Sequence, residues 1–198
     1  MTERPFGPPP RSNNLLALLR LARGDRSGMQ LFGATTGAFF ASLIPLAALP
    51  LVVGLATLAK GEVLRAATDL VAALCVLLLP PVVSHAFARR WGREEAWARY
   101  AVAFNWSQFA LSVLFMVLLT LVGLLLSGGG PAPVADGTAS LFVLLCLIPV
   151  GYGLWLQWFL ARAGLGVSGG RAALLVLATC LCTMAVVFVH AAFGADHG

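Results

Sequence analysis

The side chains able to do chemistry are few, and they lie at similar positions in four long apolar segments. Each lies roughly 6–13 Å, at 1.5 Å rise per residue, inside the arginine-bearing end of its segment. The groups at this depth are Thr35, Thr36, His85, Asn105, Ser107, Gln108 and Gln157. We expect a polar layer, centred on His85, Asn105, Gln108 and Gln157, that joins helices by hydrogen bonds. The alternative is a small polar cavity open at that end.

Catalysis has little support in this set. His85 is a possible base for lipid chemistry, but an acid or base works only with a partner within hydrogen-bond reach. No acidic residue lies at the same depth as His85. The chain also lacks a phosphate loop, a nucleophile elbow and a zinc-protease motif. We therefore predict no catalytic residue, no cofactor and no enzymatic activity.

Metal binding is also not expected. Cys180 and Cys182 are two residues apart, so on a helix they point about 200° apart. His190 and His197 flank Asp196, but a short terminus is a poor frame for a metal site. Buried cysteine behaves as a small apolar residue, and this interpretation covers all four cysteines: Cys75, Cys146, Cys180 and Cys182.

The composition indicates an integral membrane protein. The chain has 198 residues, of which 60% are hydrophobic and 11% are charged. An ordinary soluble domain is roughly half apolar and about a quarter charged. The same numbers exclude an intrinsically disordered chain, and four cysteines are too few for a disulfide scaffold.

The positions of the charges predict where the chain crosses the membrane. Five stretches without charge can each hold the roughly 20 apolar residues of a membrane helix. The predicted spans are 31–58, 66–87, 103–126, 138–161 and 170–193. The fold class is therefore all-α: a polytopic bundle of five transmembrane helices with a short N-terminal interfacial helix. The expected parts are a cytoplasmic segment at 1–28, a membrane domain at 29–194 and an outside tail at 195–198.

Two features of the spans stay open at this stage. Pro45 and Pro50 in the first span indicate either one kinked helix or a re-entrant hairpin, and 33 residues between charges favour one helix. Asp69 follows Arg65 by one helical turn, and the two are expected to form an ion pair.

Lysine and arginine predict the orientation. Eleven of them lie on one side of the five-span plan and two on the other, and the side rich in Lys and Arg faces the cytoplasm. The N-terminus is therefore expected in the cytoplasm and the C-terminus outside. The net charge of +5 reflects this topology, and no nucleic-acid partner is expected.

Two basic segments are candidate lipid or partner surfaces. A helix over residues 13–22 places apolar residues on one face, with Arg20 and Arg23 able to meet anionic headgroups. The alternative is that this helix packs on the protein's own cytoplasmic face. The second segment, between spans 2 and 3, is expected to form a short surface helix that docks acidic lipid or a partner, or to be a plain positive stop with aromatic anchors. Its candidate residues are Arg89, Arg90, Arg93, Trp91 and Trp97.

Two segments carry a resemblance to a known family. They are Tyr152-Gly153-Leu154-Trp155-Leu156-Gln157-Trp158 with the turn that follows it, and Tyr100-Ala101-Val102-Ala103-Phe104-Asn105-Trp106-Ser107. With the five-span plan, they resemble the bacterial branch of the Yip family of membrane proteins. The resemblance implies a small polytopic scaffold without catalysis. A composition rich in Ala, Leu and Arg and poor in Lys suggests the inner membrane of a bacterium.

The leading hypothesis is a non-enzymatic inner-membrane protein that organises lipid or partner proteins. Its expected partners are anionic lipids on the cytoplasmic side and a membrane protein or a second copy of the chain. The alternative is a small transporter or channel subunit, since helices broken by proline often line substrate sites.

Overall fold

The computed structural model describes the backbone of residues 13–127 and 136–195, and the side chains of 13–124 and 147–192. In these ranges the chain is helical apart from short connections, and no strand is present. The elements are α1 (Asn14–Ala22), the 3-10 helix η1 (Arg26–Leu31), α2 (Thr36–Ala59), α3 (Val63–Arg90), α4 (Glu94–Ser127), α5 (Asp136–Leu165) and α6 (Gly169–Ala195). Apart from Ala195, the predicted tail at 195–198 lies outside the described residues.

Among the residues that the structure describes, four helices, α2, α3, α4 and α6, are long and apolar enough to cross a membrane. The predicted spans 66–87, 103–126 and 170–193 lie inside α3, α4 and α6. The predicted span 138–161 lies inside α5, which has 30 residues and therefore a length of about 45 Å. The protein is thus an all-helical chain of membrane-protein character.

The first predicted span begins too early. Residues 26–31 form η1, and Thr35 has an extended backbone with φ −103° and ψ 155°. The Thr35 hydroxyl oxygen accepts a hydrogen bond of 3.2 Å from the backbone N–H of Ala38. A threonine that caps in this way occupies the position just before the first helical residue, so α2 starts at Thr36 rather than near residue 31.

The two prolines of α2 do not produce a hairpin. Pro45 and Pro50 both lie inside one continuous helix of 24 residues. Membrane helices accept proline because neighbouring groups satisfy the freed carbonyls. The structure therefore has the single helix rather than the re-entrant alternative.

The segment after α3 also differs from expectation. A separate surface helix was predicted there, but α4 begins at Glu94 and runs without a break to Ser127. The connection is only residues 91–93, and Gly92 has a φ of +64°. This left-handed conformation suits glycine, and it lets the chain reverse direction in so few residues.

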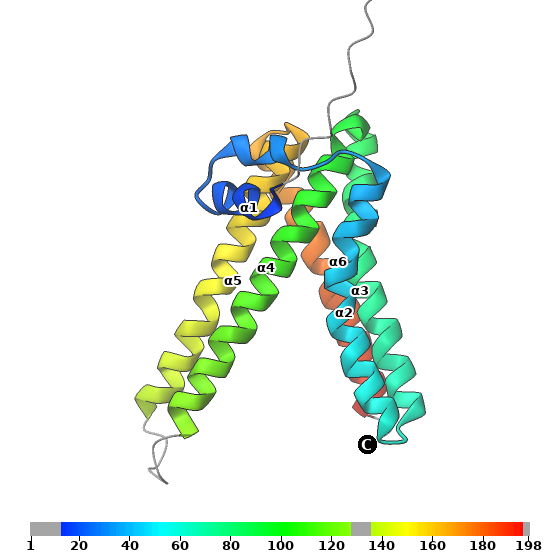
Figure 1. Cartoon of the computed structure of the whole chain (residues 1–198), viewed down its shortest axis with the longest axis vertical. Helices are drawn as coiled ribbons and strands as arrows, with labels where there is room; N and C mark the ends of the chain where they lie inside the picture. The colour runs from blue at the N-terminus through cyan, green and yellow to red at the C-terminus, as the bar shows by residue number, and fades with distance from the viewer. Residues whose placement is uncertain (1–12, 128–135, 196–198) are drawn as a thin grey trace, which may run out of the picture.

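The long helices form two arms that meet at one end (Figure 1). One arm consists of α4 and α5, and the other of α2, α3 and α6. The arms diverge toward the end opposite α1, as Figure 1 shows. We call the end where they meet the helix junction; it comprises the N-terminal parts of α2, α4 and α6 and the C-terminal parts of α3 and α5.

The core of the molecule lies at the helix junction, where α1 and η1 cover it (Figure 1). Ala17 and Leu21 of α1 and Met29 of η1 are buried in this core together with residues of α4, α5 and α6. A Cβ at Gly28 would lie 2.7 Å from the carbonyl oxygen of Ala17. Gly28 is therefore needed for η1 to approach α1 so closely.

Candidate functional site

A buried hydrogen bond joins α2 to α4 at the helix junction. The amide Nδ2 of Asn105 donates to the hydroxyl oxygen of Ser42 at 2.9 Å, and both residues are buried. The Ser42 hydroxyl in turn donates to the carbonyl oxygen of Phe39 at 2.6 Å. Because buried polar groups cost free energy unless they are bonded, this chain of bonds fixes the register of the two helices.

Trp97 of α4 forms a second contact, between α2 and α3. Its ring centroid lies 5.4 Å from that of Phe39 and 4.7 Å from that of His85. Its Nε1–H donates to the hydroxyl oxygen of Ser84 at 3.1 Å. Trp97 was expected among residues at a lipid or partner surface, but its half-buried ring packs within the helix junction.

The four residues at the centre of the predicted polar layer have different surroundings. Asn105 is buried and bonded to Ser42, whereas His85 is exposed with its ring against Trp97. Gln108 and Gln157 are half-buried on α4 and α5. In the part of the chain that the structure describes, no hydrogen bond joins any two of these four residues. The structure thus brings polar groups together in pairs between helices.

Ser42 and Ser84 are the partners that the sequence pattern missed. Both are almost fully buried, at 0% and 2% exposure. Each is a lone serine on an apolar helix, at nearly the depth of the predicted layer. That depth was a usable signal, but serine commonly bonds to its own helix backbone, so its type alone did not indicate a link between helices.

Basic side chains gather at the helix junction. The connectivity brings together α1, the C-terminal ends of α3 and α5 and the N-terminal ends of α4 and α6 (Figure 1). The predicted candidates Arg23, Arg89, Arg90 and Arg93 are exposed there, and Arg20 and Trp91 are half-buried. All of these side chains therefore lie at one end of the molecule.

Three arginines at this end lie in an ion pair or over an aromatic ring. Arg89 lies 3.6 Å from a carboxylate oxygen of Glu94. The guanidinium of Arg171 lies 5.8 Å from the ring centroid of Trp91, and that of Arg162 lies 4.8 Å from the ring centroid of Trp158. A cation over an aromatic face is attracted by the ring quadrupole. The two aromatic contacts orient Arg162 and Arg171 without neutralising them, whereas Arg89 is paired with a carboxylate.

Helix α1 packs on the junction through one face and exposes another apolar face. Ala17 and Leu21 are fully buried, and the hydroxyl of Tyr152 donates to the carbonyl oxygen of Ala22 at 2.9 Å. Leu15 and Leu19, by contrast, are 78% and 55% exposed. The helix therefore has features of both predicted alternatives: it is attached to the protein, and it presents leucine outward.

The turn between α1 and η1 contains a carboxylate held by hydrogen bonds. Asp25 accepts a hydrogen bond of 2.7 Å from the Ser27 hydroxyl and one of 2.9 Å from the Ser27 backbone N–H. These bonds favour the charged form and lower the pKa of the Asp25 carboxyl below its usual value, with a smaller contribution from Arg20. Asp25 is therefore an ionised cap of η1 at neutral pH.

The residues considered for metal binding are dispersed. Among the described residues, no group of three or more His, Cys, Asp or Glu side chains is placed to hold a metal ion. Cys75, Cys180 and Cys182 are free thiols. Cys146 lies outside the described side chains, and Asp196 and His197 lie outside the described residues.

His190 has a partner that the sequence did not indicate. Its Nε2 lies 3.0 Å from Oδ1 of Asp69 on α3. Asp69 was expected to pair with Arg65, but Arg65 pairs with Glu62 at 3.2 Å. The tertiary arrangement therefore links the far ends of α3 and α6 by a histidine–carboxylate contact.

Comparison with known proteins found no similar protein. The chain matches no model of a known protein family, no curated protein and no solved structure. The class of the protein therefore rests on its own helices, and four of those in the described ranges are long and apolar enough to cross a membrane.

Proposed function

We propose that this chain is a five-helix membrane protein, with the helix junction in the cytoplasm, that acts as a non-enzymatic scaffold for lipid or partner proteins. In this proposal α5 is the fifth span, and α1 lies at the cytoplasmic membrane surface. The resemblance to the bacterial Yip branch agrees with this topology and with residence in a bacterial inner membrane. The observation that carries the proposal is the open separation of the two arms.

The α4 helix shows how open the arms are. Beyond the junction it is half-buried along one face only, at Leu111, Phe115, Leu118 and Val122. A Cβ on Gly153 of α5 would lie 3.6 Å from Leu111, so this face packs on α5. The exposed remainder includes Val113, Leu114, Met116, Val117, Leu121 and Leu124. Apolar surface of this extent marks contact with lipid or another protein.

The contrast between a packed junction and exposed arms supports a scaffold role. At the junction, buried hydrogen bonds and the α1–η1 cover hold the helices in one arrangement. Away from it, the arms present apolar faces that nothing else in the described chain covers (Figure 1). A rigid junction with open arms is suited to receiving another membrane helix between them, because such helices associate by close packing.

The positions of the basic residues support the orientation. Arg89, Arg93 and Arg162 lie at the junction end, whereas Lys60 and Arg65 lie at the end where α2 connects to α3. Arginine and lysine are enriched in cytoplasmic segments. The leucines that α1 exposes beside Arg23 suit the headgroup region of the same leaflet.

Cysteine labelling tests the five-span plan. The native cysteines are replaced by alanine, and Glu62→Cys, Arg93→Cys and Ser168→Cys are made singly. A membrane-impermeant maleimide is expected to label Glu62→Cys in intact cells, and the other two only after lysis. Labelling of Ser168→Cys in intact cells would show that α5 does not cross the membrane, and would contradict the plan.

Photo-crosslinking tests the scaffold role. A benzophenone amino acid is placed at Val117 or Leu121, which are exposed on the open arm, or at Glu95 as a control outside the apolar surface. The two arm positions are expected to give adducts of defined protein mass in membranes, and the control is not. A chain that gives no protein adduct and is recovered alone in mild detergent would contradict a scaffold role for partner proteins.

A further inference from the structure

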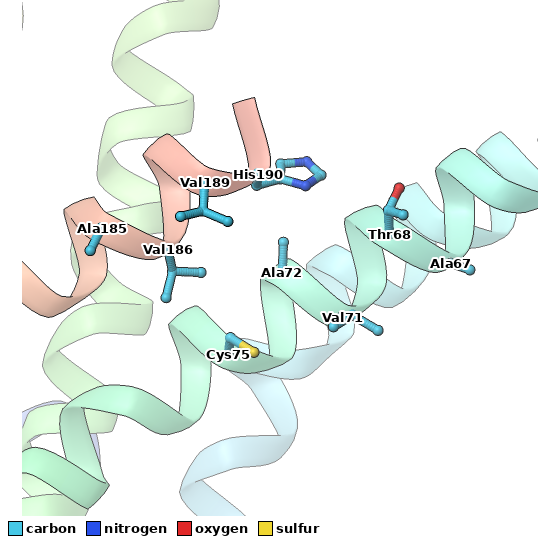
Figure 2. Close-up of a pocket in the computed structure, with 9 residues that line it drawn as sticks. All are labelled: Ala67, Thr68, Val71, Ala72, Cys75, Ala185, Val186, Val189 and His190. Carbon is cyan, nitrogen blue, oxygen red and sulfur yellow. The ribbon is translucent and has the colours of Figure 1, made fainter. Parts of the chain in front are cut away.

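A groove of about 540 Å³ lies between residues 67–75 of α3 and 185–190 of α6 (Figure 2). Its volume is within the range of roughly 300–1,000 Å³ that is typical of ligand pockets. Small side chains create the space: Ala67 and Ala72 line it on α3, and Ala185 lines it on α6. Figure 2 shows that side chains of both helices border this space, with those of Ala72 and Val186 between its two ends.

The two ends of the groove differ in polarity. His190 and Thr68 lie at one end, and Cys75 and Ala185 lie at the other (Figure 2). His190 pairs with Asp69 at 3.0 Å, and these side chains are 37% and 32% exposed. A polar, partly exposed end followed by apolar walls is the profile that an amphiphilic molecule requires.

The polar end belongs to the charged rim of the molecule. Arg65 and Glu62 form an exposed ion pair one to two turns from Asp69, at the start of α3. In the orientation proposed above, this rim lies at the headgroups of the outer leaflet. The groove then extends from the headgroups toward the centre of the bilayer.

The dimensions of the groove fit one leaflet. Residues 67–75 extend about 12 Å along α3 at 1.5 Å rise per residue. The hydrocarbon of a single leaflet is about 15 Å thick, half of the roughly 30 Å core. A molecule lying in the groove would therefore stay within one leaflet.

The shape and lining of the groove suit a slender apolar occupant. Its volume of about 540 Å³ is spread along about 12 Å of helix. Its lining is apolar apart from Thr68, Cys75 and His190. An extended hydrocarbon chain has the required shape and polarity.

We propose that the α3–α6 groove binds an acyl chain of an outer-leaflet phospholipid, with the headgroup at the His190–Asp69 pair. This site rests on the proposed membrane placement. His190 contacts Asp69 through Nε2, so Nδ1 is the ring nitrogen left for a polar headgroup atom. The Asp69 carboxylate can attract the quaternary ammonium of a choline headgroup. The small residues at 67, 72 and 185 make room for the chain.

Photolabelling with a modified lipid tests the site. The full chain is reconstituted in phosphatidylcholine vesicles that contain a phosphatidylcholine with a diazirine on its acyl chain. After irradiation, the labelled peptides are identified by mass spectrometry. Residues 67–75 and 185–190 are expected to carry more label than the exposed α2 segment around Ala48.

Filling the groove provides the matched comparison. Ala72→Phe is expected to lower labelling of the two groove segments about tenfold, which corresponds to roughly 1.4 kcal/mol of binding free energy. Ala185→Phe, from the opposite wall, is expected to do the same. Ala48→Phe adds the same side chain at an exposed position of α2 and is expected to leave the labelling unchanged.

The outcomes separate this site from the membrane placement. Carbonate washing of the vesicles shows whether the chain is integrated, and circular dichroism shows whether each variant is helical. Uniform labelling of an integrated chain, or equal labelling of Ala72→Phe and Ala48→Phe, would overturn the groove alone. Release of the chain by carbonate would overturn both proposals.

Discussion

The hydrogen bond between Asn105 and Ser42 leads to an unusual prediction about paired substitutions. Ser42→Ala removes the acceptor and leaves the Asn105 amide buried, at 2% exposure, without that bond. A buried polar group left unpaired costs about 1–3 kcal/mol. Removing the Asn105 amide instead costs Ser42 less. The Ser42 hydroxyl keeps one hydrogen bond, because it still donates to the Phe39 carbonyl oxygen at 2.6 Å.

A second substitution is therefore expected to rescue the first. Asn105→Leu places an apolar group of similar size at the buried position, and replacing both partners by apolar groups is nearly neutral. The double variant should thus be more stable than Ser42→Ala alone. The coupling energy between Ser42 and Asn105 should be about 0.6–1.7 kcal/mol, as for other hydrogen bonds between membrane helices.

The measurement is the free energy of unfolding in mixed micelles, with helix content followed as a denaturing detergent is added. Thr120→Ala is the control, because Thr120 is exposed and its hydroxyl donates to Met116 of its own helix; its effect should stay within about 0.5 kcal/mol. A double variant less stable than Ser42→Ala would refute the reasoning that this bond joins α2 to α4.

Two further predictions concern the α1–η1 cover. Gly28→Ala should destabilise the fold by about 1–3 kcal/mol, because its Cβ would lie 2.7 Å from the Ala17 carbonyl oxygen. Gly37→Ala is the control, because a Cβ there would meet nothing within 4 Å. Equal free energies of unfolding for the two variants would count against this contact. Tyr152→Phe removes the hydrogen bond to the Ala22 carbonyl. It should lower the free energy of opening of α1 by about 0.5–1.5 kcal/mol, which is measured as faster hydrogen exchange of the α1 amides. Unchanged exchange would mean that the bond does not hold α1.

Helix positions were largely predictable from the spacing of charges. The spans predicted from stretches without charge agree with both ends of α3, α5 and α6, and with the C-terminal end of α4, within a few residues. The starts of α2 and α4 were missed, because Thr35 caps α2 and because the polar residues after Gly92 continue into α4. Hydropathy does not register a helix that continues past the apolar stretch.

For the candidate site, the sequence predicted only the level along the helices at which its polar side chains lie. The pattern placed Asn105 and His85 at one level, and both take part in contacts between helices. It did not indicate Ser42 or the role of Trp97, because a partner 63 residues away depends on which helix faces are brought together. A side chain's type limits the bonds it can make but does not identify the other half of the pair.

By itself, the sequence determined the membrane character of this chain and the approximate extent of its long helices, because both depend on local composition and helix rise. Only the tertiary structure decided that the helices divide into two arms, that α1 is attached to one end, and that His190 meets Asp69 beside a groove. These features arise from side chains distant in sequence. Their contacts depend on how each helix is rotated against its neighbours, which local composition does not specify.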